Sequence, residues 1–100
     1  MSNQTKQAAP TIKPRLVQFN GTQVIEGWPE KVEEAQRQTY AILGKKRYNR
    51  IPYGQGILYP KVGPKPCHDC CAMPGQLHVH GCDMEECPKC HGQFFICGCW

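Results

Sequence analysis

Two short runs with neighbouring apolar residues stand near the start of the chain, where Leu16-Val17-Gln18-Phe19 is followed by Asn20-Gly21 and then by Gln23-Val24-Ile25-Glu26. Asn-Gly between two runs of this kind accepts the positive φ angles of a type I′ turn. The segment therefore predicts a β-hairpin.

A short helix is predicted over residues 30–38. Pro29 stands just before it, where proline is preorganised for helix entry, and acidic residues open it. Val32, Ala35 and Thr39 fall on one face at i, i+3 and i+7. We expect Trp28 to pack into a small core, and stacking on a ligand is the alternative.

A second hairpin is predicted from residues 40–43 and 46–51, with Gly44 opening a type II′ turn. Residues 52–66 contain four prolines and three glycines, which predicts an extended linker. Farther on, Asp83 and Glu86 have the spacing of a capping box, which predicts one helical turn before Cys87. Residues 94–96 (Phe-Phe-Ile) are expected to form a strand that leads into Cys97.

The length of 100 residues limits the chain to one small domain, or to a small domain with a metal-binding lobe. We expect an α+β fold in four segments. Residues 1–14 form a disordered arm, residues 15–54 a hairpin–helix–hairpin lobe, residues 55–66 a Pro/Gly linker and residues 67–100 a zinc-ribbon-like lobe. No export signal and no apolar run of membrane-spanning length is present, so we expect a cytoplasmic protein without a membrane partner.

All eight cysteines and all four histidines lie in residues 67–99. Cys67-His68-Asp69-Cys70 and Cys87-Pro88-Lys89-Cys90 are CxxC units separated by sixteen residues, a spacing typical of zinc ribbons. The segment has too few large apolar side chains to offset the entropy of ordering about thirty residues. A structural zinc ion supplies roughly 10–16 kcal/mol, so we expect the segment to fold only with metal.

One imidazole and three thiolates complete a second set of ligands, and two ions are favoured over one. The predicted ligands are Cys67, Cys70, His78, Cys82, Cys87, Cys90, Cys97 and Cys99. The ligand pairs can combine by nearest neighbours in sequence or alternately. We expect the alternate, cross-brace pairing, which places both CxxC units on one ion. A disulfide framework is the alternative, disfavoured by the missing export signal and by the histidines within the cluster.

The tail resembles a family of small, largely uncharacterised bacterial and phage proteins with a zinc-ribbon-like cysteine cluster. The resemblance rests on Arg50-Ile51-Pro52-Tyr53-Gly54, the two CxxC units, Pro74-Gly75-Gln76-Leu77-His78, Gly81-Cys82-Asp83-Met84-Glu85, Gly92-Gln93 and Cys97-Gly98-Cys99. It implies metal binding and no activity.

The chain departs from that family at three places. Cys71 and His91 stand where the family has glycine after each CxxC, and His78-Val79-His80 replaces two adjacent histidines. The residue after such a turn tends to need positive φ, which glycine adopts freely. We interpret Cys71 as a spare thiol rather than a ligand, and we favour His78 over His80.

Residues 1–66 carry a net charge of +7 and residues 67–100 a net charge of −3, which singles out the basic half. The main hypothesis is a non-catalytic module that binds a protein. A nucleic-acid adaptor is an alternative, through Lys45, Lys46, Arg47, Tyr48 and Arg50, with Tyr48 or Tyr53 stacking on bases. Further alternatives are a phage-encoded inhibitor of a host enzyme and a thiol redox or metal sensor. An enzyme is disfavoured because four protein ligands close each site.

Overall fold

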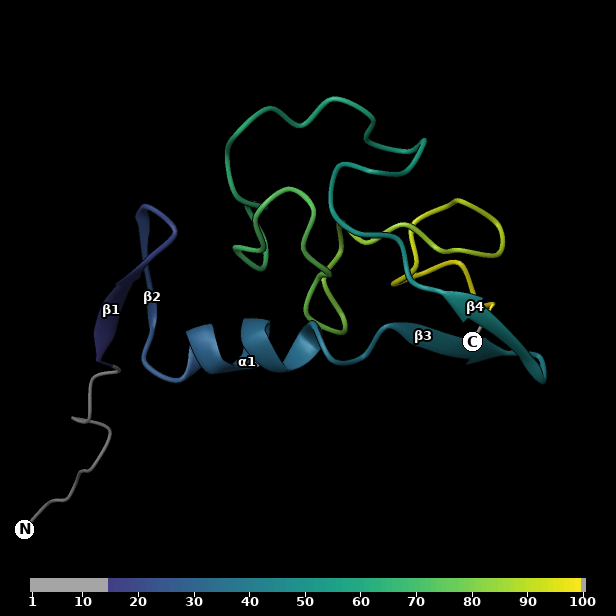
Figure 1. Cartoon of the computed structure of the whole chain (residues 1–100), viewed down its shortest axis with the longest axis horizontal. Coiled ribbons are helices and arrows are strands. Elements are labelled where there is room, and N and C mark those ends of the chain that lie inside the picture. The colour runs from purple at the N-terminus through teal and green to yellow at the C-terminus, as the bar shows by residue number, and fades with distance from the viewer. Residues whose placement is uncertain (1–14, 100) are drawn as a thin grey trace, which may run out of the picture.

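The computed structural model describes residues 15–99 and shows an α+β chain with two antiparallel hairpins and one helix in that range (Figure 1). The arm expected over residues 1–14 lies outside the described residues. Helix α1 runs between the two hairpins, and the cysteine-bearing half of the chain lies along one side of them (Figure 1). Among the described residues, no helix is long and apolar enough to cross a membrane.

The first hairpin is confirmed. Strand β1 (Leu16–Phe19) pairs with β2 (Thr22–Ile25), and Leu16 lies opposite Ile25. Asn20 and Gly21 have φ angles of 51° and 84°, as a type I′ turn requires. The Asn-Gly pair therefore sets both the turn and the register.

Helix α1 (Trp28–Ala35) begins before the predicted range and ends three residues earlier than predicted. Val32 and Ala35 are buried on its inner face. Beyond Ala35, the amides of residues 36–38 bond to carbonyls three residues back, so the chain tightens into turns. The Gln36 side chain bonds to both backbone groups of Leu77, at 2.8 and 2.7 Å, which fixes this end of the helix against the cysteine-bearing half of the chain.

The second hairpin joins β3 (Tyr40–Leu43) to β4 (Lys46–Asn49). Its turn is type I′ rather than the predicted II′, because Lys45 (φ 73°) as well as Gly44 (φ 59°) has positive φ. The type I′ turn matches the twist of the strands. It requires Lys45 to adopt a left-handed backbone conformation, which is unfavourable for a residue with a side chain.

Residues 50–99 contain a single β-bridge, Glu86 with Gln93, and no helix or longer strand. The strand predicted over residues 94–96 is wrong, since these residues form a turn. The helical turn predicted before Cys87 is also wrong, because residues 83–84 form an isolated turn. In both places the backbone bends sharply to bring cysteines together, which leaves no room for a regular element.

The linker residues 55–66 form neither helix nor strand, but they arch outward and return (Figure 1). The amide of Leu58 donates to Glu86 Oε1 at 2.8 Å, and Val62 packs against the core near Tyr53. The segment is therefore tied to the cysteine-bearing half of the chain at two points.

The core of the described residues is divided between two clusters that each contain cysteines. Val32 of α1 lies with Tyr53, Cys67, Cys70, Ala72 and Cys82. Leu43 of β3 lies with Cys87 and Phe94. The hairpins and helix thus bury their apolar side chains against the cysteine half of the chain rather than against one another.

Candidate metal centres

The first group of candidate ligands is fully buried. It consists of Cys67, Cys70, His78 and Cys82, and the ligand atoms of all four lie within 4.8 Å of one another. Cys67 Sγ is 3.6 Å from Cys82 Sγ, and His78 Nδ1 is 3.4 Å from the sulfurs of Cys70 and Cys82.

These distances match the edges of a zinc tetrahedron. Two sulfurs about 2.3 Å from a central ion lie about 3.8 Å apart, and a sulfur and an imidazole nitrogen lie about 3.6 Å apart. The observed 3.6 and 3.4 Å separations are close to both values. The four side chains can therefore hold a metal ion without rearrangement.

The second group contains four cysteines and is only partly buried. Cys87 is buried, Cys97 and Cys99 are intermediate and Cys90 is exposed, and their sulfurs also lie within 4.8 Å of one another. Leu43, Phe94 and the partly buried Tyr48 pack against this group from one side. The β3–β4 hairpin thus shields Cys87 and leaves Cys90 in solvent.

The cross-brace pairing is wrong for this structure. Each CxxC unit combines with the ligands that follow it, so the groups span residues 67–82 and 87–99 in succession. Closing two short loops costs less chain entropy than closing longer interleaved loops. The β-bridge between Glu86 and Gln93 also folds the second group back on itself.

Both CxxC turns have the same backbone geometry. Cys71 donates to the carbonyl of Cys67, and His91 donates to the carbonyl of Cys87, each at 2.8 Å. Cys71 (φ 68°) and His91 (φ 64°) both have positive φ, which confirms the conformation expected where the resembling family has glycine.

Contacts within the first group shift the pKa values of its own side chains. Hydrogen bonds with Cys70 and Cys82 lower the pKa of the Cys67 thiol, and hydrogen bonds with Cys67 and Cys70 raise the pKa of the Cys82 thiol. Burial works to lower the pKa of His78, but hydrogen bonds and negative charges of Cys67 and Cys70 outweigh it and raise the pKa to about 9. Such sharing of protons marks a site where a divalent cation would replace them.

Side chains from the first half of the chain surround this group. The Trp28 indole donates to the carbonyl of Cys70 at 2.8 Å, and Asn20 Nδ2 donates to the carbonyl of Cys71 at 2.7 Å. The Tyr53 ring meets the His78 ring edge-on, with centroids 5.2 Å apart. Trp28 packs against the core as predicted, while Tyr53 is buried and does not present its ring to a nucleic acid.

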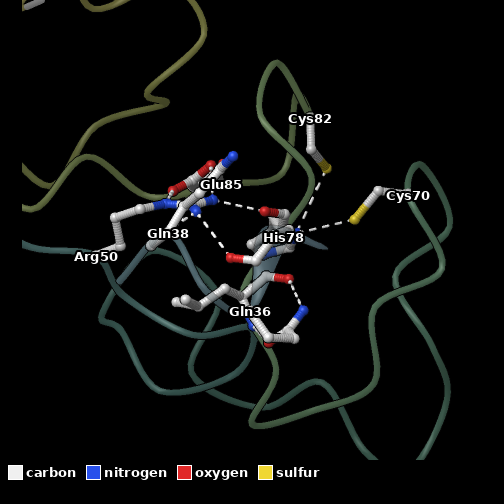
Figure 2. A network of polar contacts seen from close by, with 9 residues as sticks. Gln36, Gln38, Arg50, Cys70, His78, Cys82 and Glu85 are labelled. Carbon is white, nitrogen blue, oxygen red and sulfur yellow. Dashed lines mark hydrogen bonds and ion pairs between the residues drawn. The ribbon is translucent and has the colours of Figure 1, made fainter. Parts of the chain in front are cut away.

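Arg50 forms the largest polar network near the first group (Figure 2). Its guanidinium donates to both carboxylate oxygens of Glu85, at 2.9 and 3.1 Å, and to the carbonyls of Gln38 and His78. The side chains of Arg50 and Glu85 are 5% and 2% exposed. Arg50 therefore joins the end of α1, the second hairpin and the ligand His78.

Placing Arg50 in a phosphate-binding patch is wrong. A buried guanidinium paired with a carboxylate cannot reach a phosphate. Nothing in the charge pattern distinguishes Arg50 from Lys45, Lys46 and Arg47. The only sequence feature that sets Arg50 apart is its position. It follows the second hairpin and is the first residue of the Arg50–Gly54 segment on which the family resemblance rests.

The remaining cysteine and histidines lie outside both groups. Cys71 is partly exposed and joins neither group, in agreement with a spare thiol. His80 and His68 are exposed, so His78 supplies the imidazole of the first group. His91 instead contacts Glu86, with Nδ1 2.6 Å from Oε2.

No family model, no curated protein and no solved structure matches the chain.

Proposed function

We propose that the chain is a zinc-binding module that holds two structural Zn²⁺ ions, one in each group of four ligands. The observation that carries this proposal is the tetrahedral spacing of Cys67, Cys70, His78 and Cys82, together with a second group of four cysteines whose sulfurs also lie within 4.8 Å of one another. Three or four thiolates around one position select zinc over the harder Mg²⁺ and Ca²⁺.

Two features support a structural rather than a catalytic role for these ions. Each group supplies four protein ligands, whereas a catalytic zinc keeps one position for water or substrate. In addition, both core clusters of the described residues are completed by cysteine ligands. Without metal, the cysteines would be protonated and the ion that links the four ligands of each group would be missing.

We further propose that the module binds a protein. Large apolar side chains remain exposed on the second hairpin and beside the second group, among them Ile42 (59% exposed), Phe95 (54%) and Ile96 (68%). Exposed apolar side chains of this size are typical of contact surfaces. A nucleic acid is less well supported, because only Lys45, Lys46 and Arg47 of the basic run are exposed and Arg47 lies 3.9 Å from the Tyr40 ring.

Native mass spectrometry of the full chain, with and without chelator, tests the metal. We expect two zinc ions per chain and all eight cysteines reduced. A metal-free, folded chain, or mass losses from disulfides, would overturn the proposal.

Binding of a short duplex and of single-stranded RNA, measured at increasing salt, tests the partner class. We expect no salt-dependent complex, since neutralising several phosphates would give a steep loss of affinity with salt. A complex that weakens steeply with salt would overturn the protein-partner proposal and indicate a nucleic-acid partner instead.

A further inference from the structure

The two cysteine groups differ in how well solvent reaches their sulfur atoms. All four ligands of the first group are buried, and Trp28 and Tyr53 lie over them. In the second group only Cys87 is buried, and Cys90 is the one exposed ligand among the eight. Access to a thiolate is one of the two factors that set its rate of oxidation.

The second factor is the electron density on sulfur, and the overall charge of each zinc-loaded group makes it higher in the second group. With zinc bound, three thiolates and an imidazole leave a net charge of about −1, whereas four thiolates leave about −2. Within the second group, hydrogen bonds from amides lower the electron density on one sulfur more than on another. Cys87 accepts two such bonds, from Lys89 and Cys90, while Cys90 accepts one, from Gly92.

We propose that the group Cys87, Cys90, Cys97 and Cys99 is a peroxide-reactive zinc–thiolate site, with Cys90 as the attacked ligand, and that the first group is inert by comparison. The inference rests on the proposed zinc binding. It deepens that function by assigning a structural role to one ion and a releasable role to the other.

The chemistry balances with hydrogen peroxide as the oxidant. The Cys90 thiolate attacks one peroxide oxygen, the O–O bond breaks and hydroxide leaves, which gives a sulfenic acid on Cys90. A thiolate of Cys97 or Cys99 then attacks the Cys90 sulfur, and the sulfenic oxygen departs as a second hydroxide. Two thiolates lose two electrons in forming the disulfide, two solvent protons convert the hydroxides to water, and Zn²⁺ leaves because two ligands remain.

The positions of the sulfurs allow this disulfide. The four sulfurs lie within 4.8 Å of one another, and Cys90 is on an exposed turn. Gly98, with φ of 77°, separates the two candidate partners. A small movement of either loop brings two sulfurs to bonding distance, whereas the first group is held by Arg50, Trp28 and Gln36.

The test uses the zinc-loaded full chain with Cys71→Ser, which removes the one cysteine outside both groups. Native mass spectrometry first counts the zinc ions. Hydrogen peroxide is then added in small excess, zinc release is followed with a chromogenic chelator, and disulfides are located by peptide mapping. We expect one ion to leave at least tenfold faster than the other, with Cys90 linked to Cys97 or Cys99. Dithiothreitol with added zinc should restore the starting mass.

Loss of both ions at one rate, earlier loss from the first group, or a first disulfide that excludes Cys90 would overturn the inference and leave the proposed zinc binding intact. A chain that binds fewer than two ions before peroxide would overturn both. Because Cys90→Ser could lose its ion outright, competitive N-ethylmaleimide labelling of the Cys71→Ser chain provides a second measurement. Cys90 should be labelled first among the seven cysteine ligands, and earlier labelling of any first-group cysteine contradicts the inference.

Discussion

The two cysteine groups share one backbone turn but lie in different surroundings. In each, the first cysteine of the CxxC unit exchanges backbone hydrogen bonds with residues four and five positions later, all at 2.8 Å. The first group is then enclosed by α1, Tyr53 and the Arg50 network, whereas the second is covered on one side by the β3–β4 hairpin. The comparison teaches that local sequence sets how ligands are presented, while distant segments decide how essential and how accessible each site is.

The largest difference should appear when one ligand of each group is replaced. Cys70→Ser removes a buried ligand at the centre of the larger core cluster, and metal binding worth roughly 10–16 kcal/mol exceeds the stability of most small domains. We expect this variant to lose cooperative unfolding. Cys90→Ser should lose order only around residues 87–99 and the second hairpin.

The indole N–H resonance of Trp28 reports the outcome, because that group donates to the Cys70 carbonyl. It should keep its dispersed chemical shift in Cys90→Ser and move to the random-coil position in Cys70→Ser. Equal loss of structure in the two variants would show that the groups are energetically equivalent, contrary to this comparison.

The next largest effect on stability should come from the hydrogen-bond network of Arg50, which contacts only the first group. Arg50→Gln leaves Glu85 buried without its partner, and breaking a buried ion pair in this way costs about 3–5 kcal/mol. Arg47→Gln on the preceding strand β4 removes an exposed cation and its contact with the Tyr40 ring, and should change stability by less than about 1 kcal/mol. Urea unfolding of the zinc-loaded variants measures both, and a loss below about 1 kcal/mol for Arg50→Gln would refute the role of the network.

The same contrast between local and distant contacts explains how much could be predicted from the sequence. The first hairpin followed from Asn20-Gly21 between two short apolar-containing runs, and the positive φ at Cys71 and His91 followed from their position after a CxxC unit. Each of these features is decided within a few residues. They needed no knowledge of the rest of the fold.

Features that depend on distant segments could not be derived in this way. The assignment of ligands to the two ions depends on how the chain folds between the cysteine pairs. Spacing alone allowed both the sequential and the cross-brace pairing. The burial of Arg50 depends on Glu85, thirty-five residues away, and on the carbonyls of Gln38 and His78. The strand expected at residues 94–96 had the right composition, but the return of the chain to Cys97 and Cys99 required a turn.

A smaller effect is expected at Glu86, which supports the second group. Its buried carboxylate accepts the amide of Leu58 and contacts His91 at 2.6 Å. Burial opposes ionisation, but the hydrogen bonds from Leu58, His91 and Ile57 prevail and lower the pKa of Glu86. Glu86→Gln should therefore cost about 1 kcal/mol near neutral pH.

The pH dependence of that loss has a definite sign. Because the pKa of Glu86 is lower in the folded state, its contribution is complete above the ordinary glutamate value and disappears as the pH falls through the folded value. The stability difference between Glu86→Gln and the unchanged chain should shrink as the pH falls below about 5. A difference that grows below about pH 5 would contradict the ionised state assigned to Glu86.

The smallest expected effect on stability concerns the residue that follows each CxxC unit. Cys71 and His91 occupy the same left-handed position, which costs a residue with a side chain about 1–2 kcal/mol relative to its preferred backbone. Glycine removes this strain but has more entropy to lose on folding, so Cys71→Gly should gain about 0.5 kcal/mol. His91→Gly also loses the contact with Glu86, so its gain should vanish or reverse. Thermal unfolding of the zinc-loaded proteins measures both shifts, and an equal rise in midpoint for the two variants would show that the His91–Glu86 contact contributes nothing.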